Sequence, residues 1–126
     1  MKVPSVMLVD DEVSFVEATA KRLTKRKMDV ITAFSAAECL EKLAADQNLD
    51  VIVLDIKMPG MNGIDALKEI KKVSPLTEVI MLTGHATVES AIEGMKLGAY
   101  DFLRKPCEIL HLKRDHGPTG RICDGF

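Results

Sequence analysis

Long apolar runs are absent from this sequence. None approaches the roughly 20 residues that a membrane-spanning helix needs. Residues 1–4 lead directly into a short strand-like segment, without the longer apolar region and cleavage site of a signal peptide. We therefore expect a cytoplasmic protein with no membrane partner.

Cysteine is scarce, and there is no excess of positive charge. Cys39, Cys107 and Cys123 are odd in number and have no metal-ligand spacing, which indicates reduced thiols in a cytoplasmic protein. The formal net charge of −2 gives no electrostatic reason to expect direct nucleic-acid binding. No internal repeat or low-complexity linker divides the 126 residues, a length that points to one domain.

Short apolar runs alternate with helical patterns along the chain. Five runs predict strands: Ser5–Asp10, Val30–Ala33, Val51–Asp55, Glu78–Thr83 and Tyr100–Pro106. Apolar stripes at helical spacing predict at least four helices, around Val13, Val16, Ala20 and Leu23, around Leu40, Leu43 and Ala44, around Ile64, Leu67 and Ile70, and around Val88, Ala91, Ile92 and Met95. This alternation predicts an α/β domain, with a parallel sheet covered by helices on both faces.

Several helix ends carry recognisable signals. Ser14 with Glu17, and Ser35 with Glu38, have the spacing of a capping box, in which two side chains satisfy amide groups at the start of a helix. Gly98 is expected just past the end of the fourth helix.

Acidic residues follow two of the predicted strands. Asp10 and Asp11 come after the first strand, and Asp55 ends the third, ahead of a turn that contains Gly60 and a tight backbone position at Gly63. Taken alone, Asp55 could merely begin that turn. Right-handed crossovers, however, place the carboxyl ends of parallel strands at one edge of the sheet, where ligands bind in such folds.

The same edge is expected to receive Thr83 from the fourth strand and Lys105 from the fifth. Three carboxylates in one cleft repel one another unless a cation joins them, and ligands that are all oxygen suit Mg²⁺. A carboxylate can act as a nucleophile and become an acyl phosphate, while lysine and threonine can contact phosphoryl oxygens. The expected cluster therefore fits phosphoryl transfer onto an aspartate.

Five separated motifs closely resemble the receiver domain of bacterial two-component response regulators, of the chemotaxis and nitrogen-regulation type. They are Asp10-Asp11-Glu12, Asp55, Met58-Pro59-Gly60 with Gly63, Thr83-Gly84-His85-Ala86 and Lys105-Pro106. The match covers residues 5 to about 108. The resemblance implies a doubly wound, flavodoxin-like fold, with a five-stranded parallel sheet in the order 2-1-3-4-5.

The resemblance also implies the roles of the acidic residues. Asp55 would accept the phosphoryl group from a sensor histidine kinase. Asp11 and Asp55 would bind Mg²⁺ with their side chains, Asp10 largely through water, and Lys57 through its backbone carbonyl.

Further roles are implied outside the acidic cluster. Lys105 and Thr83 would contact the phosphoryl group, and Phe102 would turn inward as a switch when Thr83 moves. Residues 83–99 resemble the subgroup attached to transcription activators, so the expected downstream partner is a transcription-regulating output domain. Two alternatives stay open: Phe102 as a simple core residue, and His85 as an exposed loop residue rather than one that tunes phosphate lifetime.

The chain departs from this family after Glu108. Ile109, Leu110 and Leu112 begin a fifth helical stripe, but residues 116–120 contain glycine and proline, which are poor helix residues. We therefore expect a receiver core over residues 1–108, an atypical tail over residues 109–126, and a fifth helix that is shortened, displaced or absent. The apolar surface left uncovered would favour self-association over a folded-back tail.

Two other function classes fit the chain less well. An aspartate-nucleophile phosphohydrolase, the alternative function, would carry a second Asp two residues beyond the nucleophile, where this chain has Lys57. A flavin- or nucleotide-binding module would need glycines or hydroxyls after the first strand, where Asp10 and Asp11 would repel phosphate. We therefore expect a signalling switch that catalyses its own phosphorylation and slow dephosphorylation, and not a turnover enzyme.

Overall fold

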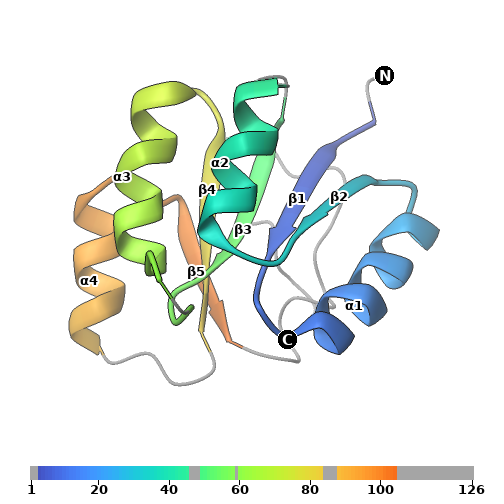
Figure 1. Ribbon diagram of the computed structural model, residues 1–126, viewed down its shortest axis with the longest axis horizontal. Helices are drawn as coiled ribbons and strands as arrows, with labels where there is room; N and C mark the ends of the chain where they lie inside the picture. Colours follow the sequence, from blue (N-terminus) through green and yellow to red (C-terminus); the bar gives the residue numbers. More distant parts are fainter. Residues whose placement is uncertain (1–2, 46–48, 59, 84–87, 105–126) are drawn as a thin grey trace.

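The computed structural model describes residues 3–45, 49–58, 60–83 and 88–104 of the chain. Strands and helices alternate throughout these ranges, as the sequence predicts (Figure 1). In chain order they are β1 (Ser5–Val9), α1 (Val13–Lys25), β2 (Asp29–Ala33), α2 (Ala36–Ala45), β3 (Val51–Asp55), α3 (Gly63–Val73), β4 (Glu78–Thr83), α4 (Val88–Lys96) and β5 (Asp101–Arg104).

The strands form one parallel sheet in the order β2-β1-β3-β4-β5, which confirms the predicted topology. Because all strands run the same way, their carboxyl ends meet at one edge, the lower edge in Figure 1. In the register between β1 and β3, Val9 pairs with Leu54. Asp10, which follows β1, and Asp55, the last residue of β3, are therefore level with each other at this edge.

Two apolar layers hold the sheet between its helices. Helices α2, α3 and α4 cover one face, and α1 lies on the other (Figure 1). Successive strand residues enter opposite layers: in β3, Ile52 and Leu54 pack with α2 and α3, whereas Val51 and Val53 pack with α1. All five residues of β3 are buried, as expected for a strand covered on both sides.

The capping box predicted at the start of α2 is present with one change. Ser35 Oγ accepts the N–H of Glu38 at 3.0 Å, but Glu38 Oε1 accepts the N–H of Phe34, one residue before the cap, at 2.8 Å. The hydrogen bond from Phe34, followed by that from Lys42, lowers the pKa of the Glu38 carboxyl. A charged carboxylate therefore anchors the first turn of α2.

The capping box predicted at Ser14 and Glu17 is wrong. Helix α1 begins one residue before Ser14, and its N-cap is Glu12, whose side chain makes no capping hydrogen bond. Asp10 sets the turn instead, because its Oδ1 accepts the N–H of Glu12 at 3.1 Å. Val13, expected on the buried stripe, lies in the first turn past the end of β1 and is 48% exposed.

Helix α4 buries a different face from the one that its apolar stripe predicts. Ile92 and Met95 are 49% and 43% exposed, whereas Gly94 is buried. A Cβ atom at Gly94 would lie 3.3 Å from the Met81 side chain and 3.8 Å from that of Ile64. The missing side chain lets the backbone of α4 lie close to β4 and α3, which turns Ile92 and Met95 outward.

The end of α4 follows the prediction. Gly98 has a φ of 107°, and the N–H of Ala99 donates to the carbonyl of Gly94 at 3.0 Å. The predicted departure at the fifth helix falls in residues 105–126, outside the described residues. Among the described helices, none has the length and hydropathy that a bilayer span requires.

Candidate metal centre at the carboxyl edge of the sheet

Two aspartates follow β1 at the carboxyl edge. The N–H of Asp10 donates to the carbonyl of Ala33 in β2 at 3.1 Å, which extends the pairing of the two strands by one residue. Asp10 is only 1% exposed, whereas Asp11 is exposed. The turn into α1 therefore buries one carboxylate and leaves the next one open to solvent.

Asp55 comes to the same place from the central strand. Asp55 ends β3, which lies between β1 and β4, and the residue is 5% exposed. Asp55 and Asp10 each come one residue after the Val9–Leu54 pair of the β1–β3 register. The strand order and register alone therefore bring these carboxylates together.

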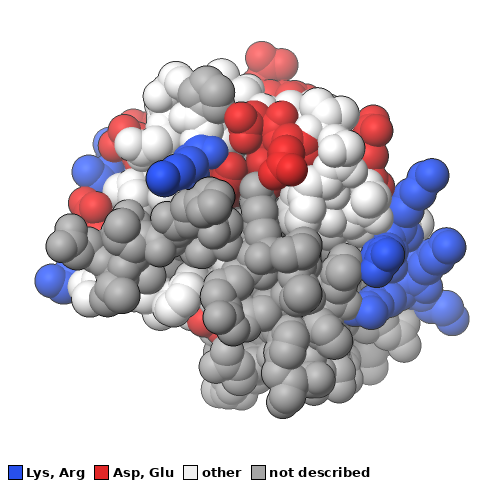
Figure 2. Space-filling view, turned by 90° about the horizontal axis from the view of Figure 1, so that it is seen from below, with Lys and Arg blue, Asp and Glu red and all other residues white. Residues whose placement is uncertain are grey.

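The three predicted acidic residues meet at this edge. One carboxylate oxygen from each of Asp10, Asp11 and Asp55 lies within 4.8 Å of the other two. Figure 2, which looks onto the carboxyl edge, shows acidic side chains gathered near its centre. In octahedral Mg²⁺ coordination at about 2.0–2.1 Å, neighbouring ligand atoms are about 3 Å apart and opposite ones about 4 Å apart. The all-oxygen donor set suits a hard divalent cation, which would draw the three oxygens to such separations and offset the repulsion between the carboxylates.

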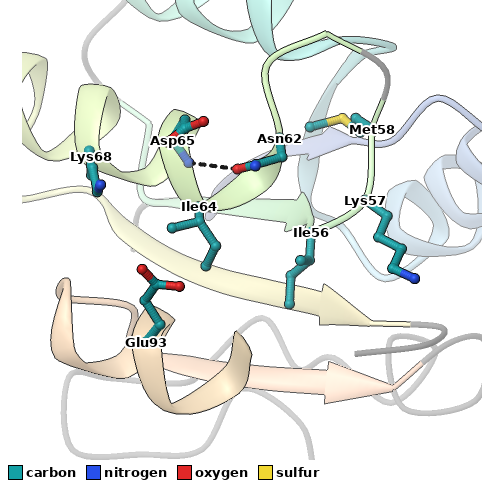
Figure 3. Close-up of a pocket in the computed structure, with 8 residues that line it drawn as sticks. All are labelled: Ile56, Lys57, Met58, Asn62, Ile64, Asp65, Lys68 and Glu93. Atoms are coloured by element: carbon teal, nitrogen blue, oxygen red, sulfur yellow. Dashed lines mark hydrogen bonds between the residues drawn. The ribbon is translucent and has the colours of Figure 1, made fainter. Parts of the chain in front are cut away.

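The loop after β3 is closed by the start of α3. The N–H of Gly63 donates to the carbonyl of Ile56 at 2.8 Å. Asn62 caps the helix, because its Oδ1 accepts the N–H of Asp65 at 2.9 Å (Figure 3). Asn62 is not among the residues predicted from the sequence, although an Asn directly before a helical pattern is a recognisable N-cap signal.

Gly63 is required by the closeness of two backbone segments. A Cβ atom at this position would lie 2.3 Å from the carbonyl oxygen of Asp55 and 2.7 Å from the Cα of Ile56. Both are main-chain atoms, so a side chain at residue 63 could be accommodated only by moving the loop or the helix. The glycine therefore fixes the backbone that carries Asp55.

We expect Gly63→Ala to weaken both the fold and cation binding at the acidic cluster. Overpacking of this kind costs about 1–3 kcal/mol, and chemical denaturation with Mg²⁺ titration calorimetry would measure the two effects. Gly60→Ala is the control, because Gly60 has a φ of 79° but no atom within 4 Å of an added Cβ. It should lose stability through backbone strain while keeping its affinity for Mg²⁺. Wild-type affinity in Gly63→Ala would contradict the proposed role of this glycine.

A groove of about 620 Å³ lies beside the same loop, between the start of α3 and α4 (Figure 3). Lys57, Asp65, Lys68 and Glu93 contribute its charged groups, and Ile56, Met58, Asn62 and Ile64 complete the lining. None of the three clustered aspartates lines it. The candidate metal centre therefore lies outside this groove.

The structure describes only some of the other predicted site residues. Thr83 ends β4 and pairs with Arg104 of β5 in the backbone register. Lys105 and His85 lie outside the described residues. Phe102, on β5, is 42% exposed, so it is not a core residue in this structure.

Comparison with known proteins gives one consistent family. The sequence profile of the response regulator receiver domain matches residues 6–115. The chain is 33% identical to a putative NtrX-like response regulator of Rickettsia bellii over 92% of its length, and 38% identical to the DNA-binding transcriptional regulator NtrC of Escherichia coli over 82%. It spans only 27% and 22% of these two relatives, which are therefore much longer proteins.

Solved structures agree with the sequence comparison. A response regulator receiver domain protein from Clostridium thermocellum superposes with a TM-score of 0.80 at 38% identity, covering 85% of this chain and 86% of that one. The receiver domain of NtrX from Brucella abortus gives a TM-score of 0.75 at 35% identity, covering 82% of this chain and 88% of that one.

Proposed function

This chain belongs to the response regulator receiver domain family, and on that premise we propose that it accepts a phosphoryl group on Asp55 from a sensor histidine kinase. The observation that carries the proposal is the convergence of Asp10, Asp11 and Asp55 within 4.8 Å at the carboxyl edge. The position of Asp55 at the end of the central strand supports its choice as the acceptor.

In the proposed transfer, a carboxylate oxygen of Asp55 attacks the phosphorus of a phosphohistidine. The phosphorus–nitrogen bond breaks, and an acyl phosphate forms on Asp55. Asp11 and Asp55 would hold Mg²⁺ with their side chains, Asp10 largely through water, and Lys57 through its carbonyl. The bound cation supplies positive charge that neutralises the phosphoryl oxygens.

Lys105 and Thr83 complete the proposed site by contacting the phosphoryl oxygens. Phe102 is the proposed switch residue, and its position on β5, next to β4, supports coupling to Thr83. The proposed downstream partner is a transcription-regulating output domain in a cytoplasmic regulator. The names of the relatives support this partner, since this chain spans about a quarter of each of them.

An aspartate-nucleophile phosphohydrolase remains the alternative function. Such an enzyme would need an acid/base carboxylate two residues beyond Asp55, where the chain has the exposed Lys57. A lysine cannot provide a carboxylate for hydrolysis, which favours a signalling switch whose own reactions are phosphorylation and slow dephosphorylation.

The function is tested by incubating the chain with acetyl phosphate, with and without Mg²⁺, and measuring its intact mass. We expect one phosphoryl group per chain with Mg²⁺, removed by hydroxylamine as an acyl phosphate would be, and none in EDTA. Failure to take up a group with Mg²⁺ would contradict the proposal. Steady release of phosphate over many turnovers, without accumulation of the modified chain, would favour the phosphohydrolase.

We also propose that residues 1–108 form the receiver core and that the atypical tail, residues 109–126, promotes self-association. The support is apolar surface on α4 and β5: Ile92, Met95 and Phe102 are 49%, 43% and 42% exposed. An ordinary fifth helix would bury several apolar side chains, each worth about 1.5–3 kcal/mol when fully buried.

Replacing the residues from Ile109 onward with an amphipathic helix of ordinary receiver pattern should therefore give a smaller and more stable particle. Light scattering would measure the size, and thermal unfolding would measure the midpoint. If both chains are monomers with the same midpoint, the tail has no such effect.

A further inference from the structure

The second half of α1 and the two residues after it carry a concentration of positive charge. The exposed bases, here called the α1 basic patch, are Lys21, Arg22, Lys25, Arg26 and Lys27. Figure 2 shows basic side chains gathered on the side where Figure 1 places α1, away from the acidic centre of the edge. Because the whole chain has a formal net charge of −2, the patch is a local reversal of sign.

Lys27 has a backbone conformation that normally selects glycine. Its φ is 65°, and no other non-glycine residue in the described ranges has a positive φ. Helix α1 ends in a Schellman motif, in which Met28 donates to the carbonyl of Leu23 at 3.2 Å and Lys27 to that of Thr24 at 2.9 Å. Met28 and Leu23 are buried in one apolar layer, so the core fixes this conformation whatever residue stands at position 27.

The helix dipole explains only part of the patch. It favours cations in the last turn, where Arg22 and Lys25 lie. Lys27 lies beyond the helix, at a position where glycine would adopt the same φ without strain. Folding needs this backbone conformation but not a lysine in it, so a lysine kept there at a cost in strain indicates a use outside the fold. The distinguishing property of Lys27 is its charge.

We infer that the α1 basic patch binds an acidic protein surface, at a site separate from the proposed acceptor. Exposed Glu17 and Asp29 lie next to the patch in the sequence, so an extended anionic surface, such as a DNA duplex or a bilayer, would meet repulsive charges at its margins. A protein can instead place its carboxylates opposite the bases alone. Helix α1 has 13 residues, about 20 Å in length, so a partner bound at its far end leaves the acidic edge open.

Poly-L-glutamate labelled with fluorescein is the probe, and its anisotropy is followed as the whole chain is added in EDTA. We expect binding that weakens as salt is raised. Lys25→Glu/Lys27→Glu removes two positive charges and adds two negative ones, which should weaken binding by about sixteenfold at about twofold for each of the four changes. The control, Lys68→Glu/Lys96→Glu, makes the same change of charge at exposed lysines of α3 and α4 and should stay within about twofold of wild type.

A third variant separates strain from charge. Lys27→Gly should raise the thermal midpoint, because glycine relieves the strain, and should weaken poly-L-glutamate binding by about twofold. A purely structural role for Lys27 would leave binding unchanged. Lys25→Glu/Lys27→Glu should still be phosphorylated by acetyl phosphate and Mg²⁺ at the wild-type rate.

Three results would overturn the inference. The first is equal binding of poly-L-glutamate by wild type and Lys25→Glu/Lys27→Glu. The second is tighter binding of duplex DNA, or of phosphatidylglycerol vesicles, than of poly-L-glutamate at equal charge and salt. The third is a phosphorylation rate that changes in the double variant but not in the Lys68→Glu/Lys96→Glu control.

Discussion

An Asp55→Asn variant is expected to take up no phosphoryl group from acetyl phosphate in the presence of Mg²⁺. The amide has nearly the shape of the carboxylate but lacks both its nucleophilic oxygen and its negative charge. Loss of a nucleophile typically costs several orders of magnitude in rate. A time course of intact mass, with wild type beside the variant, measures the effect.

Asp65→Asn is the matched control for this experiment. Asp65 is an exposed acid in the first turn of α3, close to the same loop but outside the acidic cluster. Its variant should be labelled at the wild-type rate. Labelling of Asp55→Asn at that rate would mean that the acceptor is another residue.

The second large effect is expected for Asp11→Ala, which should bind Mg²⁺ at least about tenfold more weakly. Even residues that only orient metal ligands are typically worth ten- to a hundredfold in affinity, and Asp11 supplies one of three convergent carboxylates. Calorimetric titration measures the affinity directly. Thermal unfolding gives a second readout, because a cation that binds only the folded state stabilises it by RT ln(1 + [Mg²⁺]/Kd).

Loss of negative charge alone must be distinguished from loss of a ligand. Glu17→Ala removes an exposed acid from α1 without touching the cluster, and should keep wild-type affinity and the full rise in midpoint with Mg²⁺. If Asp11→Ala behaves like Glu17→Ala, the cation site does not include Asp11.

The sheet and its acidic edge could be predicted from the sequence because both follow from local pattern and handedness. Short apolar runs between helical stripes specify strands of a parallel sheet, and right-handed crossovers then set the common edge. The meeting of Asp10 with Asp55 needs no further information, since each follows the Val9–Leu54 pair by one residue.

The errors lie where tertiary contacts override local pattern. The apolar stripe of α4 predicted burial of Ile92 and Met95, but the backbone at Gly94 packs against Met81 and turns them outward. The signal at Ser14 was outweighed by the turn that Asp10 makes with the N–H of Glu12. The periodicity of apolar residues and the spacing of capping residues do not reveal either of these contacts.

The sequence predicts a tight backbone position at Gly63, but it does not reveal the cause of that position or the positive φ of Lys27. The need for glycine at position 63 comes from the nearness of the Asp55 carbonyl, which belongs to another element. The positive φ of Lys27 comes from a helix end fixed by the burial of Met28 and Leu23. Lysine is not a residue whose presence indicates such a conformation.

The most direct test of the central claim, that the acidic edge accepts a phosphoryl group on Asp55, is to locate the group in the wild-type chain. Borohydride reduces an acyl phosphate to an alcohol, which converts the modified aspartate to homoserine, and tandem mass spectrometry of the digested chain reads its position. We expect homoserine at position 55 alone, and only after incubation with acetyl phosphate and Mg²⁺. Homoserine in place of Asp10 or Asp11, or equal modification in EDTA, would contradict the claim.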